Sequence, residues 1–241
     1  MSNEFTLKSI LSRGRDVDAS IRKLLFKKKL MDEIPLDMLT VDQRDEILKD
    51  GLMDRDPSVR QSCLDLVFGN WIHQTDNNLV LFLTGLNVVE NTKVAEEALH
   101  GFFSLVPNMF ESFSEAHFET MTPETVLTMK VYCQIKFQSK GSDAVQDLLP
   151  DISNFATYLM NYWNEFQEAS EEEEKVNLQF IVTQLLAIGE LLDFSDEVGR
   201  RSMCTLLREL LISERTNDSH VQSAVRFLRL LAENRQDYIW Y

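Results

Sequence analysis

Basic side chains are concentrated near the amino terminus of this 241-residue chain. Lysine and arginine bind phosphate groups, so such a concentration is a candidate site for nucleic acid. Residues 1–60 hold 12 Lys and Arg against 12 Asp and Glu, whereas residues 61–241 hold 12 against 27. Any contact with nucleic acid therefore belongs to the first quarter of the chain. The candidate residues are Arg13, Arg15, Arg22, Lys23, Lys27, Lys28 and Lys29.

A solvated helix face is the alternative interpretation of these basic residues. At ~100° per residue, Arg22 and Lys29 share one side of a helix, Lys23 and Lys27 share another, and Lys28 points elsewhere. We therefore do not expect all of them to touch one duplex.

Catalysis and metal binding find little support in the sequence. Neither G-x-x-x-x-G-K-[ST] nor G-x-G-x-x-G occurs, so no phosphate-binding loop is expected. No cysteine pair has zinc spacing, and Cys63 and His73 are ten residues apart on and after one predicted helix, which does not bring them together. We expect a protein that is not an enzyme and that holds no metal and no cofactor. The isolated histidines are His73, His100, His117 and His220.

Aromatic side chains are the remaining candidates for partner binding. Tyr158, Tyr162, Trp163 and Phe166 stand at i, i+4, i+5 and i+8 of one predicted helix, just before an acidic run. They could anchor a segment of a partner protein, or they could form a buried stripe between helices. The periodicity agrees with both interpretations.

The composition favours an all-α protein. The chain is 44% hydrophobic and 26% charged, with only 8 Gly and 5 Pro, which gives it few turns for a β-sandwich or barrel. Its longest apolar run, 79–83, is far shorter than the ~20 residues of a membrane-spanning helix, and the start of the sequence has no signal peptide. We expect a soluble intracellular protein with no membrane contact. The three cysteines are expected to be free thiols.

An internal repeat organises the chain. Residues 54–67, DRDPSVRQSCLDLV, combine an acidic turn, a proline and Val59-Arg60 with apolar residues on one helix face. Successive copies begin 38 and then 35 residues apart, counted from Ile21 to Val59 to Val94, which is near the period of helix-pair repeats of the HEAT type. The other copies are 16–25, 90–103, 195–207 and 217–228.

Further helices lie between and after these copies, and a helix pair cannot bury its apolar stripe unless neighbours stack on it. We expect one HEAT-repeat α-solenoid over residues 1–241, with about five to six helix pairs and an acidic loop near 167–175. Between about 107 and 175 the pattern does not define where one repeat ends and the next begins. Its concave groove would be an interaction surface. The additional helices are predicted at 41–52, 78–89, 123–137, 144–166 and 176–192, and the helices of the last two copies are predicted to extend over 197–212 and 220–233.

Several blocks of the sequence resemble the HEAT-repeat G subunits of condensin. The blocks keep the order and spacing of consecutive repeats in that family, and they cover roughly half of the chain. Because members of the family are several times longer, the resemblance implies that the chain is an internal fragment. The blocks are 6–26 (TLKSILSRGRDVDASIRKLLF), 39–72, 86–103 (LNVVENTKVAEEALHGFF) and 192–207 (LDFSDEVGRRSMCTLL).

The resemblance implies a scaffold that holds the kleisin subunit in its groove and binds double-stranded DNA in mitotic chromosome condensation. It implies SMC subunits bound indirectly through the kleisin, with the ATPase on them. It also implies a nuclear and chromosomal location with a cytoplasmic pool. The basic residues above would then contact DNA, weakly in this fragment alone. The alternative is a peptide-binding HEAT scaffold of another system, such as a nuclear transport receptor or a phosphatase scaffold.

Some arginines have a structural alternative. The arginine of the Val-Arg pair, Arg22 or Arg60, could pair with an acidic turn residue such as Asp54 in a ladder along the stack. The pair Arg200 and Arg201 follows several acidic residues, which favours charge balance over phosphate binding.

Overall fold

The computed structural model describes residues 2–27, 34 and 38–236. This part of the chain contains helices and turns and no β-strand, as the composition predicts. The chain divides into two compact units, Met1–Pro107 and Asn108–Tyr241, and each is described by itself. Whether residues 1–241 act as one solenoid segment stays a prediction.

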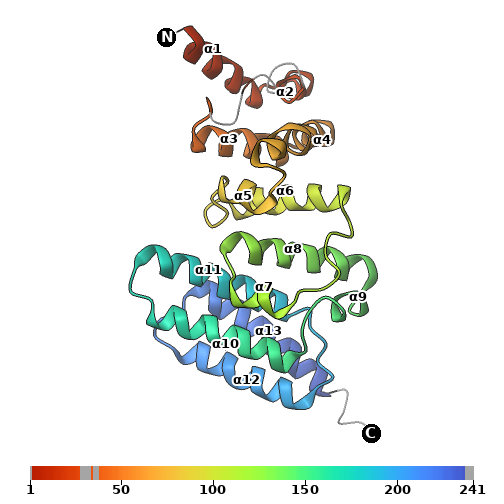
Figure 1. Ribbon diagram of the computed structural model, residues 1–241, viewed down its shortest axis with the longest axis vertical. Coiled ribbons are helices and arrows are strands. Elements are labelled where there is room, and N and C mark those ends of the chain that lie inside the picture. The colour runs from red at the N-terminus through yellow and green to blue at the C-terminus, as the bar shows by residue number, and fades with distance from the viewer. Residues whose placement is uncertain (1, 28–33, 35–37, 237–241) are drawn as a thin grey trace. The chain divides into compact units, whose positions relative to one another are not determined.

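The first unit consists of helices of 6 to 14 residues and shorter turns between them. Helix α2 packs on α4, and α4 packs on both α3 and α6 (Figure 1). A capping box begins α3: Thr40 Oγ1 accepts from the Gln43 backbone N–H, and the Gln43 side chain accepts from the Thr40 backbone N–H. The elements are α1 (Ser2–Leu11), the 3-10 turn η1 (Ser12–Arg15), α2 (Ala19–Leu25), α3 (Val41–Leu52), α4 (Pro57–Leu66), the π-helical turn η3 (Val67–Trp71), the 3-10 turn η4 (Ile72–Thr75), α5 (Leu79–Thr84) and α6 (Thr92–Leu105).

The second unit is a two-layered stack of longer helices. Helices α8, α11 and α13 pack in succession in one layer, and α10 packs on α12 in the other (Figure 1). Apolar side chains from both layers fill the space between them, among them Phe155 and Phe227, which are fully buried. The elements are α7 (Glu115–Glu119), α8 (Pro123–Lys140), α9 (Asp143–Gln146), α10 (Ile152–Glu168), α11 (Glu172–Gly189), α12 (Glu197–Ile212) and α13 (Asp218–Gln236).

The helices predicted at 123–137, 176–192 and 220–233 differ from α8, α11 and α13 only at their ends, whereas two other predicted helices end early or are divided. The helix predicted at 78–89 ends at Thr84, and the chain then turns through Asn87, which has a left-handed backbone with φ of 48°. The helix predicted at 144–166 is divided into α9 and α10, because Pro150 has no N–H to donate and Asp151 caps the start of α10.

The acidic run is mostly helical. The predicted acidic loop at 167–175 is a short turn, 169–171, between α10 and α11. Glu172, Glu173 and Glu174 form the first turn of α11, where the helix dipole favours negative charge. Most of the segment predicted as an acidic loop therefore belongs to the end of α10 and the start of α11.

Candidate functional site

The repeated acidic turns begin helices in the same way. Asp18, Asp56 and Asp196 each accept a hydrogen bond from the backbone N–H two residues later, at 2.8, 2.8 and 3.0 Å. These bonds hold the first turns of α2, α4 and α12. The repeated acidic residue is therefore a helix cap in all three copies.

The repeated arginine has a recurring backbone contact. Arg22, Arg60 and Arg200 each donate from Nη1 to the carbonyl oxygen six residues earlier, at 2.9, 2.6 and 2.7 Å. In the copy that begins α12, Gly199 takes the buried place of Val59, because a Cβ atom there would lie 2.3 Å from Ile152 Cγ2. The arginine thus ties the start of its own helix to the turn before it.

Arg22 also joins two repeats. Its Nε lies 2.6 Å from Asp54 Oδ2 and its Nη2 lies 2.9 Å from Asp54 Oδ1, and both side chains are buried. The hydrogen bonds from Arg22 hold the pKa of Asp54 below the ordinary value for an aspartate, and Asp54 raises the pKa of Arg22. The ladder considered for the Val-Arg pair is present at Arg22. Its inclusion among the DNA-contacting residues was wrong, because its donors are engaged and shielded from solvent.

Arg13 and Arg15 reach the surface, where they form ion pairs. Arg13 Nη1 lies 3.2 Å from Asp16, and Arg15 lies 2.7 Å from Glu46 and 3.0 Å from Asp50. Both arginine side chains are more than half exposed, at 62% and 65%. Exposed pairs of this kind contribute little to stability and are screened by salt, so a phosphate can exchange with their carboxylates.

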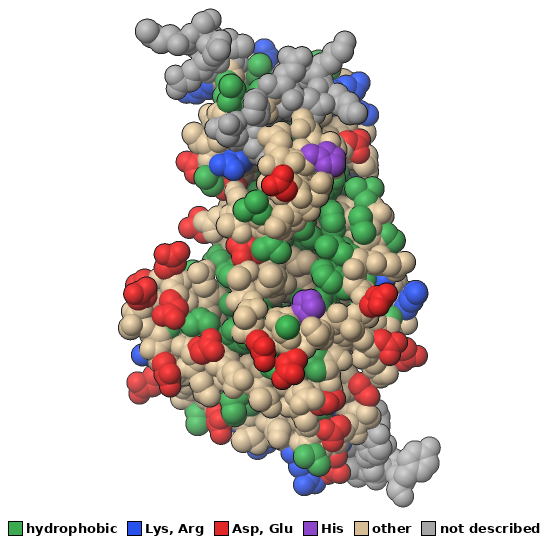
Figure 2. Space-filling view, viewed as in Figure 1, with side chains coloured by type: hydrophobic (Ala, Val, Ile, Leu, Met, Phe, Trp, Pro, Cys, Tyr) green, Lys and Arg blue, Asp and Glu red, His purple; other side chains and the backbone are tan. Residues whose placement is uncertain are grey.

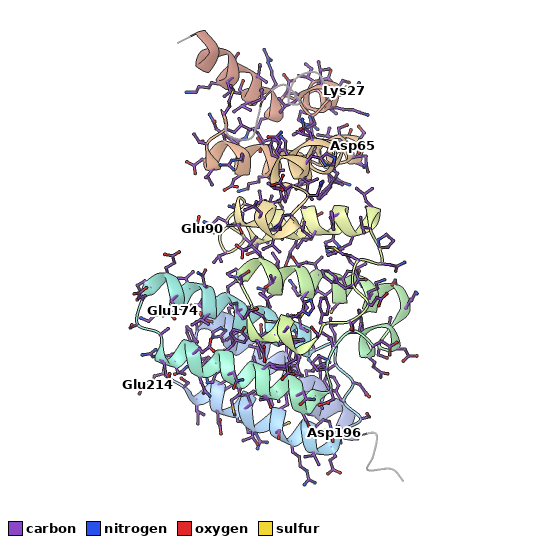
Figure 3. All side chains as sticks on the ribbon, in the orientation of Figure 1. Lys27, Asp65, Glu90, Glu174, Asp196 and Glu214 are labelled. Atoms are coloured by element: carbon purple, nitrogen blue, oxygen red, sulfur yellow. The ribbon has the colours of Figure 1, made fainter. Side chains whose placement is uncertain are left out.

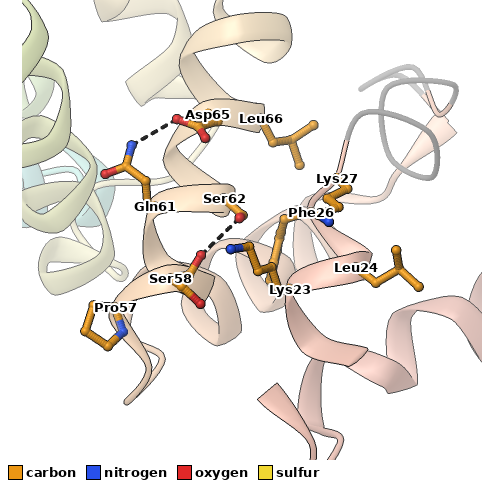
Figure 4. Close-up of a pocket in the computed structure, with 10 residues that line it drawn as sticks. All are labelled: Lys23, Leu24, Phe26, Lys27, Pro57, Ser58, Gln61, Ser62, Asp65 and Leu66. Atoms are coloured by element: carbon orange, nitrogen blue, oxygen red, sulfur yellow. Dashed lines mark hydrogen bonds between the residues drawn. The ribbon is translucent and has the colours of Figure 1, made fainter. Parts of the chain in front are cut away.

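Lys23 and Lys27 line a groove of about 870 Å³ between α2 and α4 (Figure 4). Leu24 and Leu66 add apolar surface to the groove, and among the described residues that line it Asp65 is the acidic one. The α4 wall of the groove was not predicted, although its residues recur at helical spacing on one face. That wall consists of Pro57, Ser58, Gln61, Ser62, Asp65 and Leu66. Lys28 and Lys29 lie outside the described residues.

The aromatic cluster lies in the core of the second unit. Tyr162, Trp163 and Phe166 are 6%, 5% and 6% exposed. Tyr162 Oη accepts a hydrogen bond from the Met121 backbone N–H at 2.7 Å, and the ring of Tyr158 stacks on Phe118 with centroids 4.8 Å apart. Packing inside the unit covers Tyr162, Trp163 and Phe166, so these three form the buried stripe that was the alternative and were wrongly assigned as a partner anchor. Tyr158 is half-buried at the edge of this stripe.

His220 completes this buried region and was missed as a core residue. Its ring meets those of Trp163 and Phe166 edge-on, with centroids 5.8 and 5.5 Å away. Its Nε2 lies 3.1 Å from the Gln179 carbonyl oxygen, while Nδ1 is buried without a hydrogen-bond partner. Burial lowers the pKa of His220, so the neutral ring is favoured. The sequence signal was its position at the start of α13, on the face that continues to Ala224 and Phe227.

Cys63 and His73, the candidate nucleophile and base in the sequence, lie in different surroundings. Cys63 is buried, and burial raises its pKa far above the ordinary value for a thiol, which suppresses the nucleophilic thiolate. His73 is exposed and contacts Asn77 instead. In this part of the chain no group of three or more His, Cys, Asp or Glu side chains could hold a metal ion. No described helix has the length and apolarity to span a membrane.

Acidic side chains are spread over the second unit on the face shown in Figure 2. Of the seven residues that the sequence predicts to contact DNA, four are described and are not buried. These are Arg13, Arg15, Lys23 and Lys27.

The comparison with solved structures finds a condensin subcomplex. The chain matches a chain in the crystal structure of the S. pombe condensin Cnd3-Cnd2 subcomplex with a TM-score of 0.85 and 31% identity, over 94% of this chain and 31% of that one. This chain is similar to a segment of a condensin subunit. The match also confirms the predicted HEAT-repeat solenoid fold.

Condensin relatives by sequence agree with the structural match. Condensin complex subunit 3 of Schizosaccharomyces pombe is 32% identical over 97% of this chain, and that of Homo sapiens is 28% identical over 86%. The chain spans 26% and 22% of those two proteins, about a quarter of their length. No family model matches the chain. The names of these relatives give the subunit number 3 and no letter, so the assignment to the G subunit stays a prediction.

Proposed function

We propose that this chain is a non-enzymatic HEAT-repeat scaffold segment of condensin that binds the kleisin subunit and double-stranded DNA during mitotic chromosome condensation. The observation that carries the proposal is the match at a TM-score of 0.85 to a structure solved as a Cnd3-Cnd2 subcomplex. Four condensin subunit 3 proteins, similar over 86% to 97% of the chain, support it. The scaffold would act in the nucleus and on chromosomes, with a cytoplasmic pool.

The kleisin is the direct protein partner in this proposal. Cnd2 is the partner in the matched subcomplex, and the chain would hold the corresponding subunit through its stacked helices. SMC subunits would be reached indirectly, through the kleisin. The proposal assigns no part in this contact to Tyr162, Trp163 and Phe166, because they are buried.

The DNA contact in this proposal rests on a small basic surface. Lys23 and Lys27 stand on the α2 side of the groove, and no carboxylate in the described residues forms an ion pair with them. Arg13 and Arg15 are exposed and can exchange their carboxylate partners for phosphates. Lys28 and Lys29 stay in the proposed set, and Arg22 leaves it. Because few phosphates would be contacted, binding by this segment alone would be weak and independent of sequence.

Co-expression with the condensin kleisin tests the proposal. The expected result is a complex that stays intact through size-exclusion chromatography, with one copy of each chain by light scattering. A kleisin from a different SMC complex, expressed in the same way, is the matched control and should not co-elute. If the chain instead retained only peptides of a nuclear transport or phosphatase system, the alternative scaffold would replace this proposal.

A further inference from the structure

The turn between α10 and α11 presents one serine to solvent. Ser170 lies in this turn and is exposed, and no hydrogen bond within the described part of the chain holds its hydroxyl group. Glu171, Glu172, Glu173 and Glu174 follow it directly. A hydroxyl followed by carboxylates at positions +1 to +4 has the charge pattern that acid-directed serine kinases select through basic pockets.

The chain after Ser170 can unwind at little cost. No residue between Glu172 and Asn177 is buried, and the first buried side chain of α11 is Leu178. Glu171 occupies the N-cap position without a side-chain capping bond. Opening the first turn breaks the 2.9 Å Lys175–Glu172 ion pair, the backbone hydrogen bond from Lys175 to Glu171 and the helical bonds of that turn, but it removes no buried side chain from the core. A kinase could therefore take the segment in extended form.

The basic side chain of Arg215 contacts the backbone next to Ser170. Arg215, in the loop between α12 and α13, donates from Nη1 to the carbonyl oxygens of Phe166 and Ala169, both at 3.3 Å. Ala169 directly precedes Ser170, and Arg215 Nε and Nη2 bond to no group in the described residues. Figure 3 shows the neighbouring labelled residues, Glu174 of α11 and Glu214 of the α12–α13 loop, at the same end of these helices.

We propose that Ser170 is a phosphorylation site for an acid-directed serine kinase and that Arg215 binds the phosphate. In the reaction Ser170 Oγ forms a bond to the γ-phosphorus of ATP as the bond from that phosphorus to the β–γ bridging oxygen breaks. ADP leaves, and the serine proton passes to the base of the kinase. The product carries about −1.5 to −2 charges at pH 7, which a charge-assisted bond from Arg215 offsets against the four glutamates.

The acceptor is tested on the 241-residue chain with ATP and a purified acid-directed serine kinase. Peptide mapping by mass spectrometry should find phosphate on Ser170, and Ser170→Ala should lose it. Ser219 is the matched control: it is exposed in the first turn of α13 and is followed by His220, Val221 and Gln222. The proposal is overturned if Ser170 stays unmodified while a peptide of residues 166–175 is fully modified, or if neither is modified.

The role of the acidic run is tested by replacing Glu171, Glu172, Glu173 and Glu174 with Gln together. The initial rate at Ser170 should fall about tenfold or more, the size expected when a charge-assisted contact is lost. Glu165→Gln with Glu168→Gln, two exposed carboxylates before the serine, should leave the rate unchanged. Equal rates for the wild type, the fourfold variant and the Glu165→Gln with Glu168→Gln variant would show that the kinase does not select Ser170 through the glutamates that follow it.

The role of Arg215 is tested by phosphorus NMR of the modified chain. An adjacent guanidinium favours the dianion, so Arg215→Gln should raise the second pKa of the phosphate above its value in the wild-type chain. Arg208→Gln, which removes an exposed arginine elsewhere on α12, is the control and should not move it. An unchanged pKa in Arg215→Gln would overturn the contact with Arg215.

Discussion

Arg22 of α2 and Asp54 of the turn before α4 form a buried, bidentate ion pair, with N–O distances of 2.6 and 2.9 Å. The two residues belong to successive copies of the same repeat. Asp54 also accepts a hydrogen bond from the Asp56 backbone N–H at 2.7 Å. One carboxylate therefore binds both the turn of its own repeat and the arginine of the repeat before it. The pair therefore sets the spacing between two helices that line the basic groove.

Arg22→Lys is expected to lower the melting temperature of the chain. A lysine cannot make the bidentate contact, and it leaves the Asp54 carboxylate buried with part of its bonding lost. Differential scanning calorimetry measures the change, with exposed Arg13→Lys as the matched control. An equal melting temperature for Arg22→Lys and the wild type would show that the pair does not join the repeats.

The same pair predicts a dependence on acid. The pKa of Asp54 is lowered in the folded chain, so the unfolded chain binds a proton first as the pH falls. The pair's contribution should be complete above the ordinary aspartate pKa of 3.8 and decrease as the pH falls below it. Urea unfolding of the wild type and of Asp54→Asn at pH 7 and pH 3 checks this. The difference between their free energies of unfolding should be smaller at pH 3.

His220 predicts a second loss of stability at a higher pH. Burial lowers its pKa from 6.5, so the folded state binds fewer protons than the unfolded state in mild acid. The free energy of unfolding should fall as the pH drops below 6.5. In His220→Phe the part of this fall that comes from protonation of His220 should be absent. Urea midpoints between pH 8 and pH 5 measure it. Parallel pH profiles for the two proteins would contradict the assignment.

Gly189 tests the packing of α11 on α13. A Cβ atom at this position would lie 2.4 Å from Cε1 of the buried Phe227 ring, so Gly189→Ala should destabilise the chain by about 1–3 kcal/mol. Gly69→Ala is the matched control, since nothing lies within 4 Å of its Cβ position. Chemical denaturation compares the two variants, and equal stability of both would contradict this packing.

The predicted fold depended on features that are local in the sequence. Helical periodicity placed α3 and α12 with their observed bounds, and the acidic turns are caps because an aspartate and the following N–H groups are neighbours in the chain. The divided helix near Pro150 was missed because its apolar pattern continues across the break.

The site was predicted less well because it depends on contacts between distant residues. The repeat pattern allowed Arg22 to pair with Asp54, 32 residues later, but it did not show that this pair is buried and removes Arg22 from the surface. Likewise, the aromatic spacing of α10 fits a docking face and a buried stripe equally well until the neighbouring helices are placed. The ion pairs of Arg15 with α3 could not be read from the sequence for the same reason.

The central claim, a condensin scaffold segment that contacts DNA through its first unit, is tested most directly by titrating duplex DNA with a reconstituted condensin complex. Lys23→Glu with Lys27→Glu should weaken binding equally for all DNA sequences and reduce the slope of log K against log salt concentration by about 2. Lys93→Glu with Lys140→Glu, which makes the same change of charge at two exposed lysines on α6 and α8, should have a smaller effect. Fluorescence anisotropy measures both. Equal affinity and equal salt slope for wild type and Lys23→Glu with Lys27→Glu would contradict the claim.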